Sequence, residues 1–93
     1  MSDLLKGYLG FLIMHLVSQQ ELSGNQLVEK IHERKGNRLS PGTIYPALNT
    51  LKKKGYVQIT RKVDKEKIYS LTSDGKNELN SAKNLFKEIF HDI

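Results

Sequence analysis

The chain has no cysteine and no long hydrophobic run, and each absence excludes a class of protein. Without cysteine, its 93 residues can form neither a disulfide framework nor a thiolate metal site, which fits a reducing compartment. The longest apolar stretch, residues 7–17, is too short to cross a bilayer. It also differs from a secretory signal, because Asp3 precedes it, only Lys6 supplies positive charge, and no small-residue cleavage site follows. We therefore expect a cytoplasmic protein with no membrane partner.

The residue patterns of enzymes and metal proteins are missing as well. His15, His32 and His91 are scattered, and none has a second histidine three or four residues away. The chain contains no glycine-rich phosphate loop and no nucleophile–base pair at a known spacing. We expect His15, within the apolar stretch, to be a packed core residue. The sequence thus predicts no enzymatic activity, no metal ion and no cofactor.

Charge, by contrast, is abundant and unevenly distributed. The net charge is +5 and the sequence pI is about 9.5. Residues 30–67 hold eleven Lys or Arg against three acids, whereas the remainder holds four Lys against seven acids. A basic band of this kind indicates a localised anionic partner, and nucleic acid or a membrane surface would both satisfy it. A membrane-surface role would need the apolar first helix exposed, and that helix lacks a strongly basic polar face, so we expect nucleic acid. A solvated lysine face fits the same composition.

Residues 41–54 form the most clearly marked helix of the chain. Ser40 is a suitable N-cap, whose hydroxyl can accept from the amides of the first turn, and Pro41 suits the first helical position. Gly55 suits the left-handed residue that follows a helix end. Lysines 52–54 lie where the helix dipole favours cations. Such a helix fits a DNA major groove, although an ordinary solvated surface helix has the same signals.

The two sides of this helix differ in character. Its apolar side, with i, i+3, i+4, i+7 spacing, consists of Ile44, Ala47, Leu48 and Leu51. The opposite face and its flanks carry Gly42, Pro46, Asn49 and Lys53, beside Thr43, Tyr45, Thr50 and Lys52. Asn49 could pair with an adenine edge. Pro46 lies beyond the first turn, which predicts either a kink or a regular helix that starts later than Ser40.

Other elements surround this helix. A first helix covers residues 4–19, a second follows Ser23, which has capping-box spacing to Gln26, and residues 35–37 form a loop. Alternation predicts a strand over 57–63, a polar turn over 64–66 and a second strand over 67–71. Thr72 or Ser73 then caps a final helix. The expected fold class is mainly α with a small β-hairpin (α+β), in the order α-α-α-β-β-α.

The final helix carries an apolar seam. The 3, 4, 3, 4 spacing of its apolar residues is a heptad pattern, with packing on the subunit's own core as the alternative. Because a domain of this size has a thin core and the first helix is apolar nearly all round, surplus apolar surface at both ends favours a dimer. The predicted interface residues are Leu4, Leu5, Tyr8, Leu79, Ala82, Phe86, Ile89, Phe90 and Ile93.

The second and third helices with the following hairpin resemble a winged helix-turn-helix domain. Three motifs in order also resemble the PadR family of bacterial and archaeal transcriptional regulators. A Gly-Thr-aliphatic-Tyr-Pro-Ala-Leu run occupies residues 42–48, a Leu-x-x-x-Gly ending occupies 51–55, and a Tyr-x-Leu-Thr-x-x-Gly segment occupies 69–75. The resemblance covers roughly residues 4–79. At residues 23–25, where the family often has His-Gly-Tyr, only the glycine is kept.

The resemblance implies a transcriptional regulator: a homodimeric repressor that binds a palindromic operator in double-stranded DNA. It assigns residues 1–72 to a winged helix DNA-binding domain and residues 73–93 to a C-terminal dimerisation helix, assisted by the first helix. Family members often release DNA when a small, frequently aromatic molecule binds. This chain ends after one C-terminal helix, as in the short subfamily, and has no tryptophan to line an aromatic pocket. A small-molecule effector is therefore unsupported by its residues.

In this docking, helix 41–54 enters the major groove and the wing, residues 63–67, lies on the DNA backbone. Lysines of both elements neutralise phosphates, polar side chains of the helix hold the register or contact bases, and amides near Ser23 and Asn25 hold another phosphate. The predicted DNA contacts are Ser23, Asn25, Ser40, Gly42, Thr43, Tyr45, Asn49, Lys52, Lys53, Lys62, Lys65 and Lys67. The alternative function is a winged helix protein-interaction module without specific DNA binding.

Overall fold

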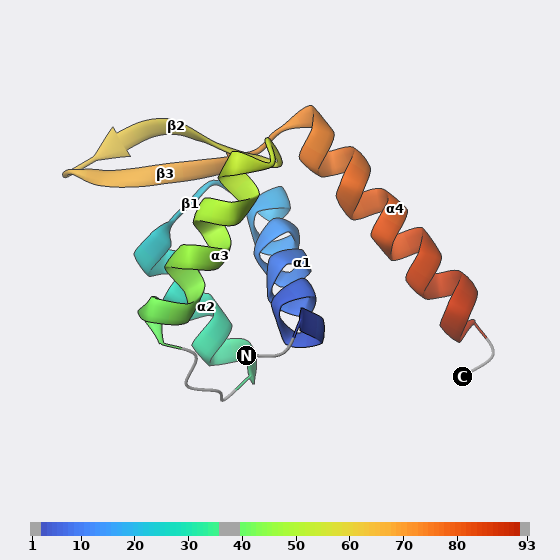
Figure 1. Cartoon of the computed structure of the whole chain (residues 1–93). Helices are drawn as coiled ribbons and strands as arrows, with labels where there is room; N and C mark the ends of the chain where they lie inside the picture. The colour runs from blue at the N-terminus through green and yellow to red at the C-terminus, as the bar shows by residue number, and fades with distance from the viewer. Residues whose placement is uncertain (1–2, 36–39, 92–93) are drawn as a thin grey trace.

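The computed structural model describes residues 3–35 and 40–91, with side chains over 7–33 and 40–91. Figure 1 shows three helices gathered beneath a small sheet, a hairpin that extends to one side, and a last helix that descends on the other side. The elements are α1 (Asp3–Gln19), β1 (Leu22–Ser23), α2 (Gly24–Lys35), α3 (Pro41–Lys53), β2 (Val57–Val63), β3 (Glu66–Leu71) and α4 (Ser73–Phe90). The expected α+β class and the order of the helices and hairpin strands are confirmed.

The strand β1 is an addition that the sequence did not predict. It has two residues and pairs antiparallel with β3, with Leu22 opposite Tyr69 and Ser23 opposite Ile68. The sheet order is therefore β1-β3-β2. Two residues carry no alternating pattern, so this strand has no signal of its own. Its effect is to attach the start of α2 to the hairpin.

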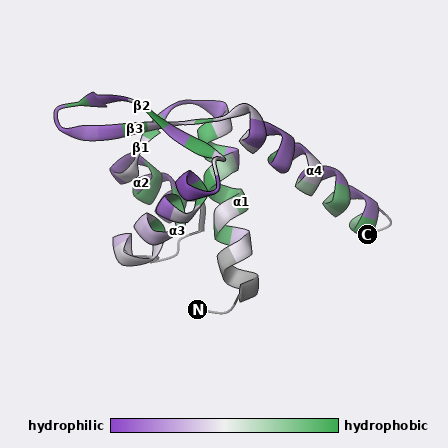
Figure 2. Ribbon diagram, turned by 45° about the horizontal axis from the view of Figure 1, so that its top comes forward, coloured by the Kyte–Doolittle hydropathy of each residue, from purple (hydrophilic) through white to green (hydrophobic). Residues whose placement is uncertain are grey.

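The hairpin turns at two residues, not at the three predicted. Asp64 and Lys65 have φ angles of 50° and 70°, the left-handed conformation that type I′ hairpin turns require, and β3 already begins at Glu66. A register shift between Ile59 and Arg61 marks a bulge in β2. Beyond the bulge every side chain of β2 is exposed, so the predicted alternation of β2 holds only in its first half. In Figure 2 the far end of the hairpin is hydrophilic.

The core lies between the three bundled helices and the sheet. Its least exposed side chains include Ile13 of α1, Leu27 and Ile31 of α2, Ile44 of α3 and Val57 of β2. The predicted apolar side of α3 is confirmed, because Ile44, Leu48 and Leu51 are buried. His15 is only half-buried, so its prediction as a packed core residue is wrong. Of the helices that the structure describes, none has the length and apolar character needed to cross a bilayer.

The caps of α3 differ from the prediction at one end and match it at the other. Ser40 is the N-cap residue, but its side chain makes no capping hydrogen bond; its carbonyl accepts from the amides of Thr43 (2.9 Å) and Ile44 (3.2 Å). Gly55 has φ +81°, as predicted. The Gly55 amide donates to Lys52 and the Tyr56 amide to Leu51, each at 3.0 Å, which is the hydrogen-bond pair of a Schellman motif.

Pro46 lies inside α3 without ending it. The helix is continuous from Pro41 to Lys53, so the alternative of a later start is wrong. The Pro46 carbonyl accepts a 3.0 Å hydrogen bond from the Thr50 hydroxyl. The backbone bond that Pro46 cannot make is the one from its own nitrogen to the Gly42 carbonyl, one turn earlier in the helix.

The first turn of α4 is attached to the end of α3. Thr72 is the N-cap, and its hydroxyl accepts from the Gly75 amide (3.0 Å) and donates to the Gly55 carbonyl (2.5 Å). The Thr72 amide donates to the Tyr56 carbonyl (3.1 Å). The Tyr56 hydroxyl reaches Glu78 at 3.3 Å, and the charge of that carboxylate raises the pKa of Tyr56. Hydrogen bonds among these five residues therefore hold the start of α4 against the end of α3.

Gly75 has no room for a larger residue. A Cβ atom there would lie 2.1 Å from the Tyr56 carbonyl oxygen, which is backbone and cannot move aside. We therefore expect Gly75→Ala to lower the free energy of unfolding by about 2–3 kcal/mol, measured by urea denaturation. The control is Asn77→Ala, at an exposed position of the same helix, which should change it by less than about 0.5 kcal/mol. Equal stability of the two variants would contradict this packing.

Candidate nucleic-acid interface

The outward side of α3 is the face opposite its buried stripe. Gly42, Pro46, Asn49 and Lys53 are all exposed, as the helical wheel predicted. Lys52 and Lys53 occupy the last turn of the helix and are exposed as well. Because the opposite side of α3 is buried in the core, the helix exposes Asn49, Lys52 and Lys53 to solvent in fixed positions.

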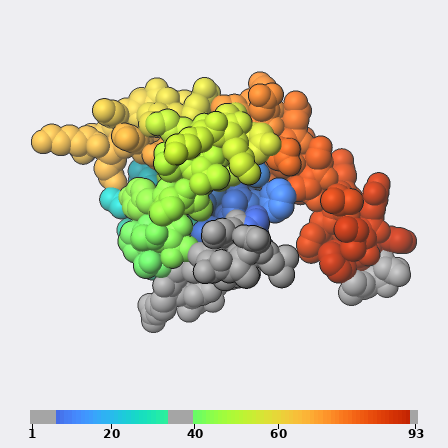
Figure 3. All heavy atoms as spheres, viewed as in Figure 1, coloured from blue at the N-terminus to red at the C-terminus, as the bar shows by residue number. Residues whose placement is uncertain are grey.

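The two flanks of this face have different neighbours. Thr43, Pro46 and Thr50 line a groove of about 680 Å³ whose opposite wall includes Gly7, Gly10 and Phe11 of α1. In Figure 3, atoms of α1 are visible in the hollow between α3 and α4. Tyr45, on the other flank, is directed towards α2. Thr43 and Tyr45 were both predicted to contact DNA together with Asn49. In the structure, Thr43 lies on the side of α3 that faces α1, whereas Tyr45 lies on the side that faces α2.

Tyr45 connects α3 to α2 and to the hairpin. Its hydroxyl donates to Asn25 Oδ1 at 2.7 Å, and Asn25 Nδ2 donates to Glu66 Oε1 at 2.6 Å. Asn25 lies in the first turn of α2 and Glu66 is the first residue of β3. Two predicted DNA contacts, Tyr45 and Asn25, are therefore brought together. Glu66, which links them to the hairpin, was predicted only as part of the polar turn over 64–66.

Gly24 explains why the glycine of the 23–25 segment is kept. A Cβ atom at this position would lie 2.4 Å from Cε1 of Tyr45 and 2.7 Å from its hydroxyl oxygen. The tyrosine ring packs directly on the glycine backbone and so sets the distance between α2 and α3. The sequence gives the two residues separately, but the contact between them joins positions 21 residues apart.

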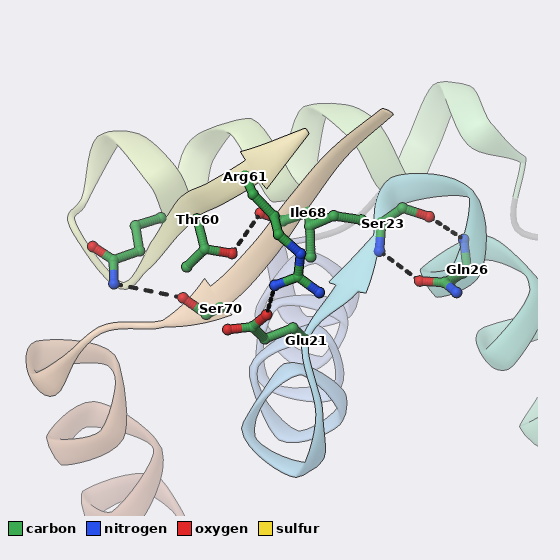
Figure 4. Close-up of polar contacts among 8 residues, drawn as sticks. Glu21, Ser23, Gln26, Thr60, Arg61, Ile68 and Ser70 are labelled. Carbon is green, nitrogen blue, oxygen red and sulfur yellow. Dashed lines mark hydrogen bonds and ion pairs between the residues drawn. The ribbon is translucent and has the colours of Figure 1, made fainter. Parts of the chain in front are cut away.

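Ser23 forms the predicted capping box with Gln26. The Gln26 amide donates to the Ser23 hydroxyl at 3.1 Å, and the Ser23 amide donates to the Gln26 side-chain carbonyl at 2.9 Å (Figure 4). Ser23 is 2% exposed. Its amide and hydroxyl are thus engaged inside the protein, whereas Asn25 is exposed beside them.

The hairpin presents cations on both strands. Lys62, Lys65 and Lys67 are exposed, and Lys62 lies directly opposite Lys67 in the register. Like charges in a cross-strand pair destabilise a sheet, and a bound anion would relieve the repulsion. Arg61 already has an anionic partner within the protein, because it forms an ion pair with Glu21, which comes just before β1 (Figure 4). The lysines are therefore the cations of the hairpin best placed for an anionic partner.

Several characterised proteins resemble this chain. Residues 13–81 match the model of the transcriptional regulator PadR-like family. Transcriptional regulator Rv3488 of Mycobacterium tuberculosis is 31% identical over 84 residues, which cover 87% of this chain and 78% of that protein. The HTH-type transcriptional regulator SarZ of Staphylococcus saprophyticus is 39% identical over 57 residues, covering 59% of this chain but only 39% of that protein.

Solved structures agree with the family model. A PadR-like transcriptional regulator from Bacillus cereus is 29% identical and superposes with a TM-score of 0.82, over 95% of this chain and 89% of that one. Bacillus subtilis PadR, solved in complex with operator DNA, is 30% identical, with a TM-score of 0.70 over 80% of this chain and 45% of that one. Since the family model spans most of the sequence and these structures share its winged helix fold, the chain belongs to the PadR-like family of transcriptional regulators.

Proposed function

We propose that this regulator is a homodimeric repressor that binds a palindromic operator in double-stranded DNA, in the cytoplasm. The observation that carries the proposal is the joint presentation of α3 and the hairpin. Both expose cations, and the pairing of β1 with β3 attaches the hairpin to the start of α2, which also contacts α3. The operator complex of the related Bacillus subtilis protein supports the same class of partner.

In the proposed docking, the outward side of α3 lies in the major groove. Asn49 is placed to contact a base edge, while Lys52 and Lys53 neutralise phosphates. Lys62, Lys65 and Lys67 of the hairpin contact the adjacent backbone. Ser40, Gly42 and Thr43, at the start of α3, contact the DNA backbone and fix the position of the helix along the DNA.

The second half of α4 supports the proposed dimer. Leu85, Phe86, Ile89 and Phe90 are between 44% and 65% exposed in the single subunit, and the rings of Phe86 and Phe90 are in contact, tilted by 44° with centroids 4.6 Å apart. Bands of hydrophobic residues along α4 are visible in Figure 2. Exposed apolar surface of this kind marks an interaction site. On α1, Tyr8 and Phe11 are 45% and 41% exposed and offer further apolar surface.

Not all predicted interface residues belong to this surface. Leu79 is 5% exposed and packs in the core of its own subunit, so the proposed interface begins after it. Ala82 is half-buried at the boundary. Leu4, Leu5 and Ile93 lie outside the described side chains. We propose residues 73–93 as the dimerisation element, with residues 1–72 as the DNA-binding domain.

Selection of bound DNA from a random pool tests partner and symmetry together. A twofold dimer should enrich a palindrome whose half-sites are centred about 34 Å, or one DNA turn, apart. Enrichment of a single unrepeated site would contradict the dimer. Failure to enrich any sequence would contradict specific DNA binding and favour the protein-interaction module.

Replacing Lys53 by alanine should weaken binding to every DNA sequence. The loss of one phosphate contact should reduce the slope of log K against log salt concentration by about one unit. The measurement is fluorescence anisotropy over a salt series with operator and scrambled duplexes. Lys87→Ala, which removes the same charge from α4, is the matched control and should leave the slope unchanged.

Replacing Asn49 by alanine should act on the operator alone. Losing a base contact should cost about 1–3 kcal/mol on the selected site and leave non-specific binding intact. The same titrations on both duplexes measure the difference, with Asn80→Ala on the exposed side of α4 as control. An equal loss on both duplexes would show that Asn49 contacts the backbone and not a base.

Replacing Phe86 by aspartate should separate the subunits. A charge at the centre of the apolar surface should weaken dimerisation at least about tenfold, measured by analytical ultracentrifugation over a concentration series. Asn84→Asp introduces the same side chain on an exposed position of the same helix and should leave the dimer intact. A dimer that withstands Phe86→Asp would place the interface elsewhere.

A further inference from the structure

A carboxylate holds the polar side chains at the junction of α2, α3 and the hairpin. Glu66 is one of only three acids within the basic band of residues 30–67. Its Oε1 accepts from Asn25 Nδ2 at 2.6 Å, shorter than the usual N–H···O distance, as expected when the acceptor is charged. Asn25 and Glu66 are both exposed, so this contact is open to solvent and to a docking partner.

The contact engages one of the two N–H donors of the Asn25 amide, a donor of the kind that DNA phosphates accept. Amide and phenol donors commonly position a protein on the phosphate backbone. Here the Asn25 amide donates to Glu66, and the Tyr45 hydroxyl donates to Asn25. Asn25 lies in the first turn of α2, where the helix dipole also favours an anion. The Glu66 carboxylate therefore occupies a position that suits a phosphate oxygen.

Glu66 is poorly explained as a purely structural residue. Its neighbour in sequence, Lys67, and the cations at positions 62 and 65 all offer attraction to a carboxylate, yet none of them is its ion-pair partner among the described residues. Its bound partner is a neutral amide 41 residues away. The interaction thus links the hairpin to the helix-turn-helix unit without neutralising the carboxylate charge.

We propose that Glu66 is an internal competitor of the DNA phosphate: an autoinhibitory contact that holds Asn25 and Tyr45 in the free protein and must be released when DNA docks. The proposal rests on the proposed DNA-binding function. It adds that breaking the Asn25–Glu66 hydrogen bond weakens the binding of every DNA sequence by the same factor. Release exchanges one Asn25 hydrogen bond for another, from carboxylate to phosphate. The pairing of β1 with β3 is unaffected by the release, so the hairpin stays attached to the start of α2.

The test compares Glu66→Gln with Asp64→Asn in the full chain. Both remove one negative charge from the hairpin, and asparagine tolerates the left-handed backbone at position 64. Asp64 takes part in none of the ion pairs found among the described residues. Affinity is measured across a salt series on a selected operator and a scrambled duplex. We expect Glu66→Gln to tighten binding to both duplexes about five- to tenfold, and Asp64→Asn to tighten it only about twofold.

The second part of the experiment repeats the comparison in a protein that carries Asn25→Ala. Without the Asn25 amide there is nothing for the carboxylate to hold, so in the Asn25→Ala background Glu66→Gln should gain no more than Asp64→Asn gains. Such non-additivity identifies a direct interaction between the two residues. Circular dichroism melts check that each variant is folded, which is expected because both side chains are exposed.

The possible outcomes distinguish a failure of the Glu66 proposal from a failure of the proposed DNA-binding function. Equal gains for Glu66→Gln and Asp64→Asn would reduce the effect to general charge and overturn the competitor while DNA binding stands. Weaker binding by Glu66→Gln would make Glu66 a residue that prepares Asn25 for DNA, which also overturns it. If neither the wild type nor Glu66→Gln binds any duplex, the proposed function fails, and the competitor with it.

Discussion

The burial of Ile44, Leu48 and Leu51 determines which side of α3 meets solvent, and the arrangement of the surface follows from it. These side chains pack in the core formed with α1, α2 and the sheet. A rotation of α3 about its axis would expose them, at about 1.5–3 kcal/mol for each large apolar side chain. The face with Asn49 and Lys53 is therefore held outwards by apolar packing on its opposite side. The polar face itself contributes little to the fold.

Sequence could predict α3 because several independent signals coincide there. The apolar period, the proline at the first position and the left-handed glycine at the end all mark the same segment, and the structure places its bounds at Pro41 and Lys53. The Ser40 hydroxyl is the exception. A side-chain cap depends on a rotamer choice, and here the hydroxyl lies 3.4 Å from the Thr43 hydroxyl instead. Capping propensity predicts which residue stands at a helix end better than which atom bonds there.

The junction around Asn25 could not be predicted for a different reason. Its contacts join residues 20 and 41 positions apart, and each residue alone has an ordinary interpretation as a helix-start, helix-face or turn residue. The strand β1 brings them together, yet two paired residues leave no periodic pattern. The candidate surface on α4 lies between these cases. Its apolar spacing was visible in the sequence, but only the structure shows that Leu79 faces inwards while Phe86 and Ile89 remain exposed.

The absence of a side chain at Gly75 affects the direction in which the whole of α4 extends from the domain. Hydrogen bonds from Thr72 to Gly55 and Tyr56 hold the first turn of α4 beside the C-terminal end of α3. Helix α4 therefore leaves the domain in a defined direction, as an arm. In a dimer joined through these arms, the distance between the two α3 helices is set by the angle at which each arm leaves its domain. Under the proposed function, the spacing of the operator half-sites would then depend on residues outside the proposed DNA contacts. Relatives with a bulkier residue at the position of Gly75 would be expected to recognise a different spacing, even with an identical α3.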